Sequence, residues 1–546
     1  MTRRSVVRRV RGAGRRLAVR VRQLAPPALI ARARVARQRA ETERLLAALP
    51  AAGRLTTTPS SVLVDAMYDN PNYWIRYALL RAALGWRGEV GVLGPYRSRE
   101  ARRTLHRLGV SETARLDARR RPDVDRSAEA RRLLGATATA ADILQWRLPE
   151  EFPPDFVYDG LLKRQRAAVV DLEDPRLPEH VAEALESLAA ARHLVESRRV
   201  DAVVLSHAVN FQFASLAWVA LRRRIPVLLV QGCYGVSRFV RLDSPRDIYN
   251  TVDRPTGRDL DGLDGDRASR LAAAGRAYIE RRLAGHTEDL GALYAFQRAA
   301  DMPGRDAIVR NFGWDGERPI IAVYASNWFD FPHPCGMTQF RDFLDWMRAT
   351  LDAAIANRRV NWLFKAHPCD AWYGGVTLSD LVPPLDRYRH VRLVPSAWNG
   401  SAVLRAVDGL VTVHGTAGIE FAAAGKPVLV ADRGWYDDAG FVRSPRTREE
   451  YVDALAGDWW KDLDLDVSAR RAQVFAGWYF GRPAWHERFV FEDDPRQAEI
   501  YRTAPALLTG SPRALARELE TIRAWFTSGR RHYHTFKMSL ANDFTV

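Results

Sequence analysis

The sequence of 546 residues contains almost no lysine. Of its 82 basic residues, five are lysine and 77 are arginine, so a lysine that persists among so many arginines is worth locating. The five are Lys163, Lys365, Lys426, Lys461 and Lys537. We expect a structural role for Lys426, whereas Lys365 lies in a motif that indicates a functional site.

Cysteine and long hydrophobic runs are also scarce. Cys233, Cys335 and Cys369 are too few and too scattered for a disulfide framework or a cysteine-based zinc site, which favours reduced thiols in a cytosolic protein. No apolar run approaches 18 residues, so we expect no membrane-spanning helix. Near the N-terminus arginine recurs every two to four residues, which excludes the apolar core of a secretory signal.

Acidic residues are missing from the first 40 positions. This segment holds 13 arginines and no lysine, aspartate or glutamate, so the rest of the chain carries only +4 of the total charge of +17. The whole chain is 47% hydrophobic and 27% charged, which is globular composition. Any affinity for a polyanion must therefore come from the N-terminal arm.

The arm has the pattern of an amphipathic helix. Small or apolar residues recur at spacings of three and four on one stripe, and arginine fills most other positions: Val7, Val10, Gly14, Leu17, Val21 and Leu24. We expect residues 1–40 to bind an anionic membrane surface, with a disordered basic tail as the alternative. The arm lacks interleaved aromatic residues, which argues against nucleic acid.

The body alternates short apolar runs with helical segments, which is typical of a doubly wound α/β fold. Strands are expected at 61–68, 89–96, 201–209, 225–232, 318–326, 360–368, 391–395, 408–415 and 426–432, with no strand in 112–190 and a loop at 241–266. Two such series predict two Rossmann-like domains that face a cleft. The expected divisions are an arm (1–50), a first domain (51–300), a second domain (301–465) and a helical extension (466–546).

Three polar clusters follow strands of the second domain, at the sheet edge where ligands bind in open α/β folds. They are Lys365-Ala366-His367-Pro368, His414-Gly415-Thr416-Ala417-Gly418-Ile419-Glu420, and Ser326-Asn327. In the second cluster, two glycines allow close approach of the backbone and a helix N-terminus follows, which favours phosphate. Lys365 and His367 can neutralise a phosphate leaving group without a metal.

Glu420 stands one turn into the helix that follows the glycines, where it could accept hydrogen bonds from ribose hydroxyls. The alternative is a solvated carboxylate stabilised by the helix dipole. For His367 the alternative is a histidine packed at a strand end. The acidic run at 462–466 follows no strand, and we expect neither a metal site nor a cofactor.

Together, the clusters around His367 and Gly418 resemble the motifs of bacterial capsule polysaccharide biosynthesis proteins. This family is similar to the Kdo transferases and, more distantly, to bacterial sialyltransferases of GT-B fold. The resemblance covers about residues 200–450. It implies that the His-Pro pair and the small-residue turn hold the nucleotide of a sugar donor, often a CMP-sugar. The positions implicated are Lys365, His367, Pro368, Thr416, Gly418 and Glu420.

The first domain lacks the paired acidic motif that such transferases use, so its catalytic base must be sought among single residues. The candidates are Asp65, Asp69, His207 and Asp243. His207 ends a buried strand and should face the cleft, which makes it the first choice, with Asp69 second. The alternatives are a core histidine and an ordinary helix cap before Pro71.

These observations predict a metal-independent GT-B glycosyltransferase of surface or capsular polysaccharide synthesis. Its partners would be a nucleotide-sugar donor, a glycan or glycolipid acceptor, and the inner face of the plasma membrane. A nucleotide-sugar epimerase or a polyol-phosphate transferase of similar fold is the alternative enzyme. A non-catalytic membrane- or polyanion-binding protein is the alternative from another class.

Overall fold

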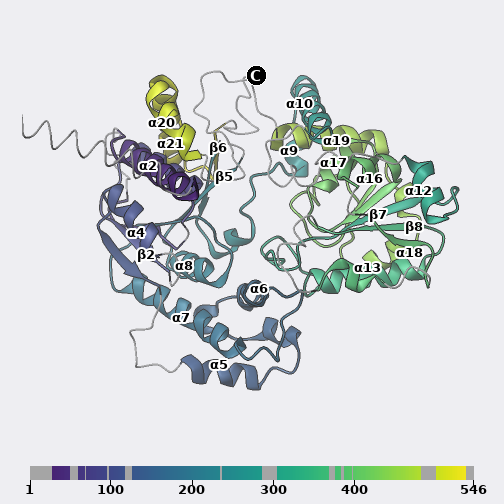
Figure 1. Cartoon of the computed structure of the whole chain (residues 1–546), viewed down its shortest axis with the longest axis horizontal. Coiled ribbons are helices and arrows are strands. Elements are labelled where there is room, and N and C mark those ends of the chain that lie inside the picture. The colour runs from purple at the N-terminus through teal and green to yellow at the C-terminus, as the bar shows by residue number, and fades with distance from the viewer. Residues whose placement is uncertain are drawn as a thin grey trace, which may run out of the picture.

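A computed structural model of the chain shows two α/β domains side by side (Figure 1). It describes residues 27–49, 59–67, 69–94, 98–116, 126–233, 236–285, 304–367, 376–382, 387–395, 398–480 and 500–535. The apolar stripe predicted for the first 24 residues lies outside this part of the chain. The predicted fold class, two Rossmann-like domains, is confirmed by the topology of the two sheets.

The first domain is built on a seven-stranded sheet in the order β12-β6-β5-β4-β1-β2-β3. Strands β3, β2, β1, β4 and β5 pair in parallel, whereas β6 and β12 add antiparallel at one edge. Side chains alternate between the faces, as in Val62, Leu63 and Val64 of β1. The strands are β1 (Val62–Asp65), β2 (Glu89–Leu93), β3 (Glu112–Arg115), β4 (Ala202–Leu205), β5 (Val227–Cys233), β6 (Val236–Leu242) and β12 (His532–His534).

Helices cover both faces of this sheet. One layer contains α5 (Arg126–Gly135), α6 (Pro154–Gln165), α7 (Leu177–Glu196) and α8 (Phe211–Arg222). The other contains α2 (Pro27–Ala47), α3 (Pro71–Leu84), α4 (Ser98–Arg107), α20 (Ile500–Gly510) and α21 (Pro512–Ser528). The Asn-Pro pair fixes the start of α3, because the Asn70 side chain accepts the N–H of Asn72 and proline occupies the first helical position. Gly85, at φ 64°, ends it.

The second domain has a five-stranded, fully parallel sheet in the order β11-β10-β7-β8-β9. The strands are β7 (Ile320–Tyr324), β8 (Asn361–Lys365), β9 (Val391–Leu393), β10 (Gly409–Thr412) and β11 (Val428–Val430). Helices on one face are α13 (Phe343–Ala356), α15 (Leu378–Leu381) and α18 (Arg448–Ala456). Helices on the other are α9 (Gly257–Asp261), α10 (Gly265–Leu283), α12 (Arg305–Phe312), α16 (Gly400–Ala406), α17 (Ala417–Ala423) and α19 (Leu465–Phe480).

Single 3₁₀ turns connect several of these elements. They are η1 (Ala140–Gln145), η2 (Pro149–Glu151), η3 (Pro245–Tyr249) and η4 (Trp459–Lys461). Prolines occupy the first positions of η2 and η3, where the missing N–H is not needed.

The packing of two segments differs from the expected divisions of the chain. Helix α10, expected in the first domain, packs on α19 and α17 of the second, because Gly275 and Gly477 let the backbones of α10 and α19 touch. The end of the chain does not form a separate extension. Helix α19 belongs to the second domain, and α20, α21 and β12 return to the first, where β12 pairs with β6. Figure 1 shows α20 and α21 beside α2.

Three strands were not predicted: β3, β6 and β12, the last of which lies in the C-terminal segment that was expected to be helical. Strand β3 lies in a segment expected to be helical, because its sequence Glu-Thr-Ala-Arg is polar and half exposed at a sheet edge, so it lacks a buried strand's apolar pattern. Strand β6 begins just before the expected loop at 241–266 and contains Ser237, Arg238 and Arg241 among its apolar residues, so it lacks a continuous apolar run. None of the described helices is long and apolar enough to cross a membrane.

Helix α6 lies between the two domains (Figure 1). Its Tyr158 hydroxyl donates a hydrogen bond of 2.6 Å to the buried carboxylate of Asp342, which caps α13 of the second domain. Its Asp159 accepts from the backbone and side chain of His333. One continuous apolar core includes residues of both sheets and of this helix. The two domains are therefore joined by buried contacts through α6.

Candidate functional site

The predicted clusters of the second domain begin at one edge of its sheet. In the parallel register, Tyr324 of β7 stands opposite Lys365 of β8, and Val323 stands opposite Val411 of β10. The residues that follow these strands are therefore brought to the same edge, as parallel pairing requires. Ser326 and the buried Asn327 follow β7, His367 follows β8, and His414 follows β10. Pro368, the other half of the His-Pro pair, lies outside the described residues.

Lys365 is a half-buried cation at this edge. Burial lowers the pKa of its ammonium group. Its Nζ lies 5.9 Å from the centre of the Tyr324 ring, and it forms no ion pair with any described residue. A desolvated ammonium without a carboxylate partner is unfavourable in the protein alone and suits an anionic ligand.

His207 and His367 come from different domains and interact electrostatically with the same carboxylate, that of Asp330. His207 follows β4 of the first sheet, and His367 follows β8 of the second. Lys163 of α6 reaches the same point, with its Nζ 3.3 Å from Oδ1 of Asp330 and over the rings of Phe329 and Phe331. Residues of both domains, the predicted base and a predicted donor-binding residue among them, are thus within electrostatic range of one carboxylate.

Both histidines are uncharged near neutral pH. Burial lowers the pKa of His207 to about 4, an effect that Asp330 opposes and Lys163 reinforces. Burial also lowers the pKa of His367, again against the influence of Asp330. A neutral imidazole has a lone pair that can accept a proton, which is the state that a general base requires.

His207 is held from its inner side by two residues of adjacent strands. Its Nδ1 lies 2.8 Å from Oγ of Ser206, and the Ser206 hydroxyl donates a hydrogen bond to Oδ2 of Asp65. Asp65 is the last residue of β1 and is fully buried. The His207 ring also packs against Phe213, with ring centres 5.5 Å apart.

The other acidic candidates of the first domain are engaged elsewhere. The two carboxylate oxygens of Asp69 accept hydrogen bonds of 2.7 and 3.1 Å from Arg39 of α2, and one of them also accepts the Trp74 indole N–H at 2.9 Å. Asp243 is exposed and pairs with Arg241 at 2.8 Å. Asp69 therefore fastens α2 to the domain, and the structure does not show it near His207.

Of the two glycines in the turn after β10, Gly418 is needed for packing against Tyr436. A Cβ at Gly418 would lie 2.2 Å from Oη of Tyr436, whose hydroxyl donates to the Gly415 carbonyl at 2.6 Å. A Cβ at Gly415 would meet Oγ1 of Thr412 at 3.1 Å. The sequence predicted that the turn makes room for a ligand, whereas at Gly418 the room is taken by a tyrosine. Thr416 occupies the N-cap position of α17, but its side chain makes no capping hydrogen bond to that helix.

Glu420 lies in a buried ion pair. Its Oε1 accepts a hydrogen bond of 2.6 Å from Nε of Arg282 on α10, and both side chains are less than 5% exposed. The same guanidinium donates to Oγ1 of Thr416 at 3.3 Å and to the Tyr278 hydroxyl at 3.2 Å. Glu420 is therefore not the solvated carboxylate that the sequence left as an alternative, because it is buried. Its Oε1 holds α10 against α17 through Arg282.

His414 carries two buried polar atoms without partners. Neither of its ring nitrogens has a hydrogen-bond partner among the described residues, and burial lowers its pKa to about 4. Its ring packs edge-on against Phe343. The Tyr324 hydroxyl and the Trp328 indole N–H, which belong to β7 and the turn after it, are likewise buried and unpartnered within the described structure. Such atoms are rare in folded proteins and mark places where a ligand can supply hydrogen bonds.

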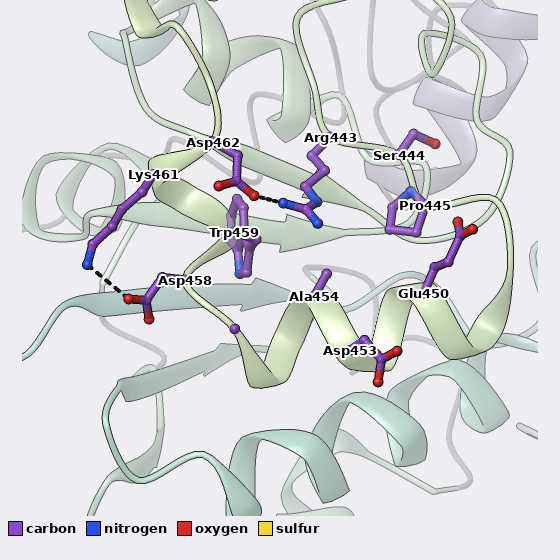
Figure 2. Close-up of a pocket in the computed structure, with 11 residues that line it drawn as sticks. Arg443, Ser444, Pro445, Glu450, Asp453, Ala454, Asp458, Trp459, Lys461 and Asp462 are labelled. Atoms are coloured by element: carbon purple, nitrogen blue, oxygen red, sulfur yellow. Dashed lines mark hydrogen bonds and ion pairs between the residues drawn. The ribbon is translucent and has the colours of Figure 1, made fainter.

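A cavity of about 500 Å³ lies elsewhere in the second domain, between α18, η4 and the segment after β11 (Figure 2). Two ion pairs, Arg443 with Asp462 and Lys461 with Asp458, lie in its lining, which also contains Glu450 and Asp453. None of the predicted site residues lines it. In the described part of the chain, no group of three histidine, cysteine or acidic residues is arranged to hold a metal ion.

Sequence reasoning missed Asp330, Lys163 and Arg282. Asp330 stands in an irregular segment after β7, where no motif marks it. Arg282 is one of 77 arginines, so its type carries no signal. Lys163 had a signal, since it is one of five lysines, but it lies on a helix far from the recognised motifs.

Comparison with solved structures finds chains of low sequence identity. The UDP-GlcNAc 2-epimerase from Neisseria meningitidis bound to UDP-GlcNAc is 10% identical, with 81% of this chain and 99% of that chain covered and a TM-score of 0.26. The glycosyltransferase SnogD from Streptomyces nogalater is 14% identical, with 82% and 99% covered and a TM-score of 0.23. The wall teichoic acid polymerase TagF is 12% identical, with 90% and 98% covered and a TM-score of 0.22.

No curated protein sequence matches the chain. A family model does match, over residues 338–455: that of the capsule polysaccharide biosynthesis proteins. The matched segment runs from the residues before α13 to α18 and contains both His367 and the glycine turn at 414–420. The resemblance to capsule polysaccharide biosynthesis proteins that the two motifs indicated is thereby confirmed over this segment.

Proposed function

We propose that the protein is a metal-independent glycosyltransferase that acts between its two domains. The observation that supports this proposal is that His207 of the first domain and His367 of the second both interact electrostatically with Asp330, so that the candidate base and the predicted donor motif are in range of the same carboxylate. In this scheme the second domain binds a nucleotide-sugar and the first binds the acceptor.

The donor would bind at the edge formed by β7, β8 and β10. Lys365 supplies a cation without a carboxylate partner in the described structure, and His367 supplies a neutral ring that can donate one hydrogen bond to phosphate. The unpartnered nitrogens of His414 offer further hydrogen bonds. These groups can stabilise the negative charge that develops on a leaving nucleotide, which is how transfer proceeds without a metal.

The acceptor hydroxyl would be activated by His207. Its proton passes to the imidazole while the acceptor oxygen attacks the anomeric carbon and the bond from that carbon to phosphate breaks. The electron pair of that bond leaves with the nucleotide. The pKa of His207, lowered by burial to about 4, keeps the imidazole unprotonated at neutral pH, as a proton acceptor must be, and it also makes this histidine a weak base in the protein without ligand.

The acceptor class follows from the family match and the N-terminal arm. A capsular or other surface polysaccharide, or its glycolipid precursor, is assembled at a membrane, and the arm carries 13 arginines without an acidic residue. Helix α2 continues this basic surface with exposed arginines at 32, 34, 37 and 44. We propose that the protein attaches peripherally to the cytoplasmic face of the plasma membrane through these residues.

A thermal-shift screen with CMP, UDP, GDP and CDP tests the donor site. A nucleotide at a hundredfold excess over its Kd stabilises the folded state by about 2.7 kcal/mol, which is a clear rise in Tm. The variants His367→Ala and Lys365→Met should abolish the shift. Lys461→Met is the matched control, since Lys461 is exposed and pairs with Asp458 outside the site. If none of the four nucleotides raises the Tm of the unaltered protein, the proposal is wrong.

A further inference from the structure

The cavity beside α18 is built like a small-molecule site (Figure 2). Its volume of about 500 Å³ falls within the roughly 300–1,000 Å³ that is usual for such sites. Three lining residues are buried and form its floor: Pro445, Ala454 and Trp459. Its rim consists mainly of charged side chains that reach solvent. None of the lining residues takes part in the proposed transfer of a sugar.

Two sides of the cavity are formed by regular backbone structure. On one side, the backbone of Arg443 pairs with β11: its N–H donates to the Val428 carbonyl at 2.9 Å, and its carbonyl accepts the N–H of Val430 at 2.8 Å. On the other side, Glu450 and Asp453 are three positions apart on α18 and therefore lie on one face of that helix. The positions of these rim residues are thus fixed by backbone hydrogen bonds.

One hydrogen-bond donor in the floor has no partner. Trp459 is 1% exposed, and its indole N–H has no hydrogen-bond partner in the described structure. Figure 2 shows its ring among the lining side chains, between the pair of Arg443 with Asp462 and the side chain of Asp458. An indole N–H can only donate, and a buried one normally has an acceptor. A ligand in the cavity can supply that acceptor.

The rim carries more negative than positive charge. The lining contains four carboxylates and two cations, and two of the carboxylates pair with these cations. Glu450 and Asp453 have no cation partner in the described part of the chain. One oxygen of Glu450 accepts the backbone N–H of Arg446 at 2.7 Å, and the side chain of Asp453 has no hydrogen bond to any described residue. The rim therefore offers acceptors to the donors of a ligand and repels an anion.

We propose that this cavity binds a neutral saccharide. A sugar hydroxyl both accepts and donates, so one ligand can accept from Trp459 and donate to Asp453 and Glu450. A phosphate has only acceptors to offer these carboxylates and adds negative charge, whereas an alkylammonium ion has no acceptor for the indole N–H. The purpose of the site rests on the proposed function, because it would hold part of a glycan acceptor or product away from the donor edge.

The rim can open at little cost. The side chains of Lys461 and Asp462 are 68% and 60% exposed, and ion pairs of such exposed side chains contribute little to stability. The hydroxyls of a sugar can therefore displace them and reach the indole N–H of Trp459. Because the rim is hydrated before binding, the net gain is small, and we expect a Kd in the millimolar range.

The experiment follows the indole N–H signal of Trp459 by ¹H–¹⁵N NMR on the full chain labelled in tryptophan. The chain has 16 tryptophans, and a Trp459→Phe variant assigns the signal. Glucose, galactose, mannose and N-acetylglucosamine are each added to about 50 mM, well above a millimolar Kd. We expect at least one of them to shift the Trp459 signal saturably. If none of the four does so, the proposal is wrong.

Asp453→Ala tests whether the sugar is held at the rim. The side chain is exposed and has no partner in the described structure, so its removal should leave the fold intact. The affinity for the sugar should fall about tenfold or more, as the loss of a hydrogen bond to a charged group does. Asp352→Ala is the matched control, because Asp352 on α13 is equally exposed and lies outside the cavity. Unchanged affinity in Asp453→Ala would overturn the proposed contacts.

Spermidine and inorganic phosphate test the class of ligand. A saturable shift of the Trp459 signal with either of them, and with none of the sugars, would make the cavity an ion site and overturn the proposal. The result is separable from that for the enzyme. If a sugar binds here and no nucleotide raises the Tm, the proposed function fails and the saccharide site stands. If nucleotides bind and no sugar shifts the Trp459 signal, the saccharide site fails and the donor site stands.

Discussion

Asp159 and His333 form a buried pair that joins the two domains: Nδ1 of His333 lies 2.7 Å from Oδ1 of Asp159, and the backbone N–H of His333 donates to Oδ2 of the same carboxylate at 3.1 Å. Asp159 belongs to α6, and His333 belongs to the segment that leads from β7 to α13. Asp159 is fully buried and His333 is 10% exposed in its side chain. The protonation state of His333 therefore affects the strength of the contact between α6 and the second domain.

The first prediction concerns the dependence of stability on pH. Burial lowers the pKa of His333, but the charge and hydrogen bond of Asp159 outweigh it and leave the pKa raised. A group whose pKa is raised on folding stabilises the protein below its unfolded pKa of about 6.5, and this stability is lost as pH rises through the folded value. The contribution of His333 to the free energy of unfolding should therefore fall from pH 6 towards pH 9, whereas histidines whose pKa burial lowers, such as His207 and His414, contribute in the opposite sense near pH 6.5.

The variant His333→Asn isolates this effect. Its amide can still donate to Asp159 but cannot be charged, so the difference in unfolding free energy between the two proteins should shrink as pH rises. Nearby Asp155, whose pKa burial raises to about 6 and the charge on His333 lowers, is coupled to His333, so the two proteins are compared above pH 7, where Asp155 is ionised in both. Urea denaturation at several pH values gives the measurement. A difference that is independent of pH would show that His333 is neutral in the folded protein.

The second prediction concerns the glycine turn. Gly418→Ala should destabilise the protein by about 1–3 kcal/mol, the usual cost of overpacking, because the new Cβ would lie 2.2 Å from Oη of Tyr436. Tyr436→Phe in the same chain removes that atom and should recover part of the loss. A double-mutant cycle by chemical denaturation measures the coupling. Additive effects of the two substitutions would mean that Gly418 meets something other than Tyr436.

The sequence predicted the elements of the fold better than their assignment to domains. Apolar runs such as Val62–Asp65 and Ile320–Tyr324 are short, buried and bounded by polar residues, so their periodicity identifies them as strands. The partner of a helix is not encoded in its own periodicity. Helix α10 was expected in the first domain because it follows that domain in sequence, and only the backbone contact of Gly275 with α19 shows where it packs.

The candidate site was predicted in part, for a similar reason. His207 and His367 each follow a buried strand, and parallel pairing alone brings such positions to a sheet edge. The residues around the two histidines come from α6 and from the irregular segment that contains Asp330. Neither segment has a sequence pattern that predicts its position in the fold. The role of Glu420 could not be decided from the sequence either, because its partner Arg282 is 138 positions away in the chain.

The third prediction tests the buried pair of Arg282 and Glu420. Glu420→Ala should cost about 3–5 kcal/mol, because it leaves the Arg282 guanidinium buried without its carboxylate. The double variant Arg282→Met/Glu420→Leu should be much less destabilised, since it leaves no buried charge. Unfolding free energies without nucleotide supply the comparison. A near-neutral effect of Glu420→Ala in the free protein would point back to a role in binding ribose.

The last prediction separates the membrane arm from the helix that follows it. Deleting residues 1–26 removes nine of the 13 arginines and leaves α2 intact, so we expect loss of binding to anionic vesicles at an unchanged Tm. Deleting residues 1–47 also removes Arg39 and Glu43, which tie α2 to Asp69 and Arg107.

That longer deletion should lower the stability as well, because Asp69 loses its bidentate partner and the apolar residues under α2, including Tyr501, are uncovered. Co-sedimentation with vesicles that contain phosphatidylglycerol, beside neutral phosphatidylcholine vesicles as the control, measures the first effect, and thermal unfolding measures the second. Full vesicle binding by the shorter deletion would assign the membrane contact to the exposed arginines of α2 instead of the arm, because each arginine near an anionic surface contributes about 1 kcal/mol.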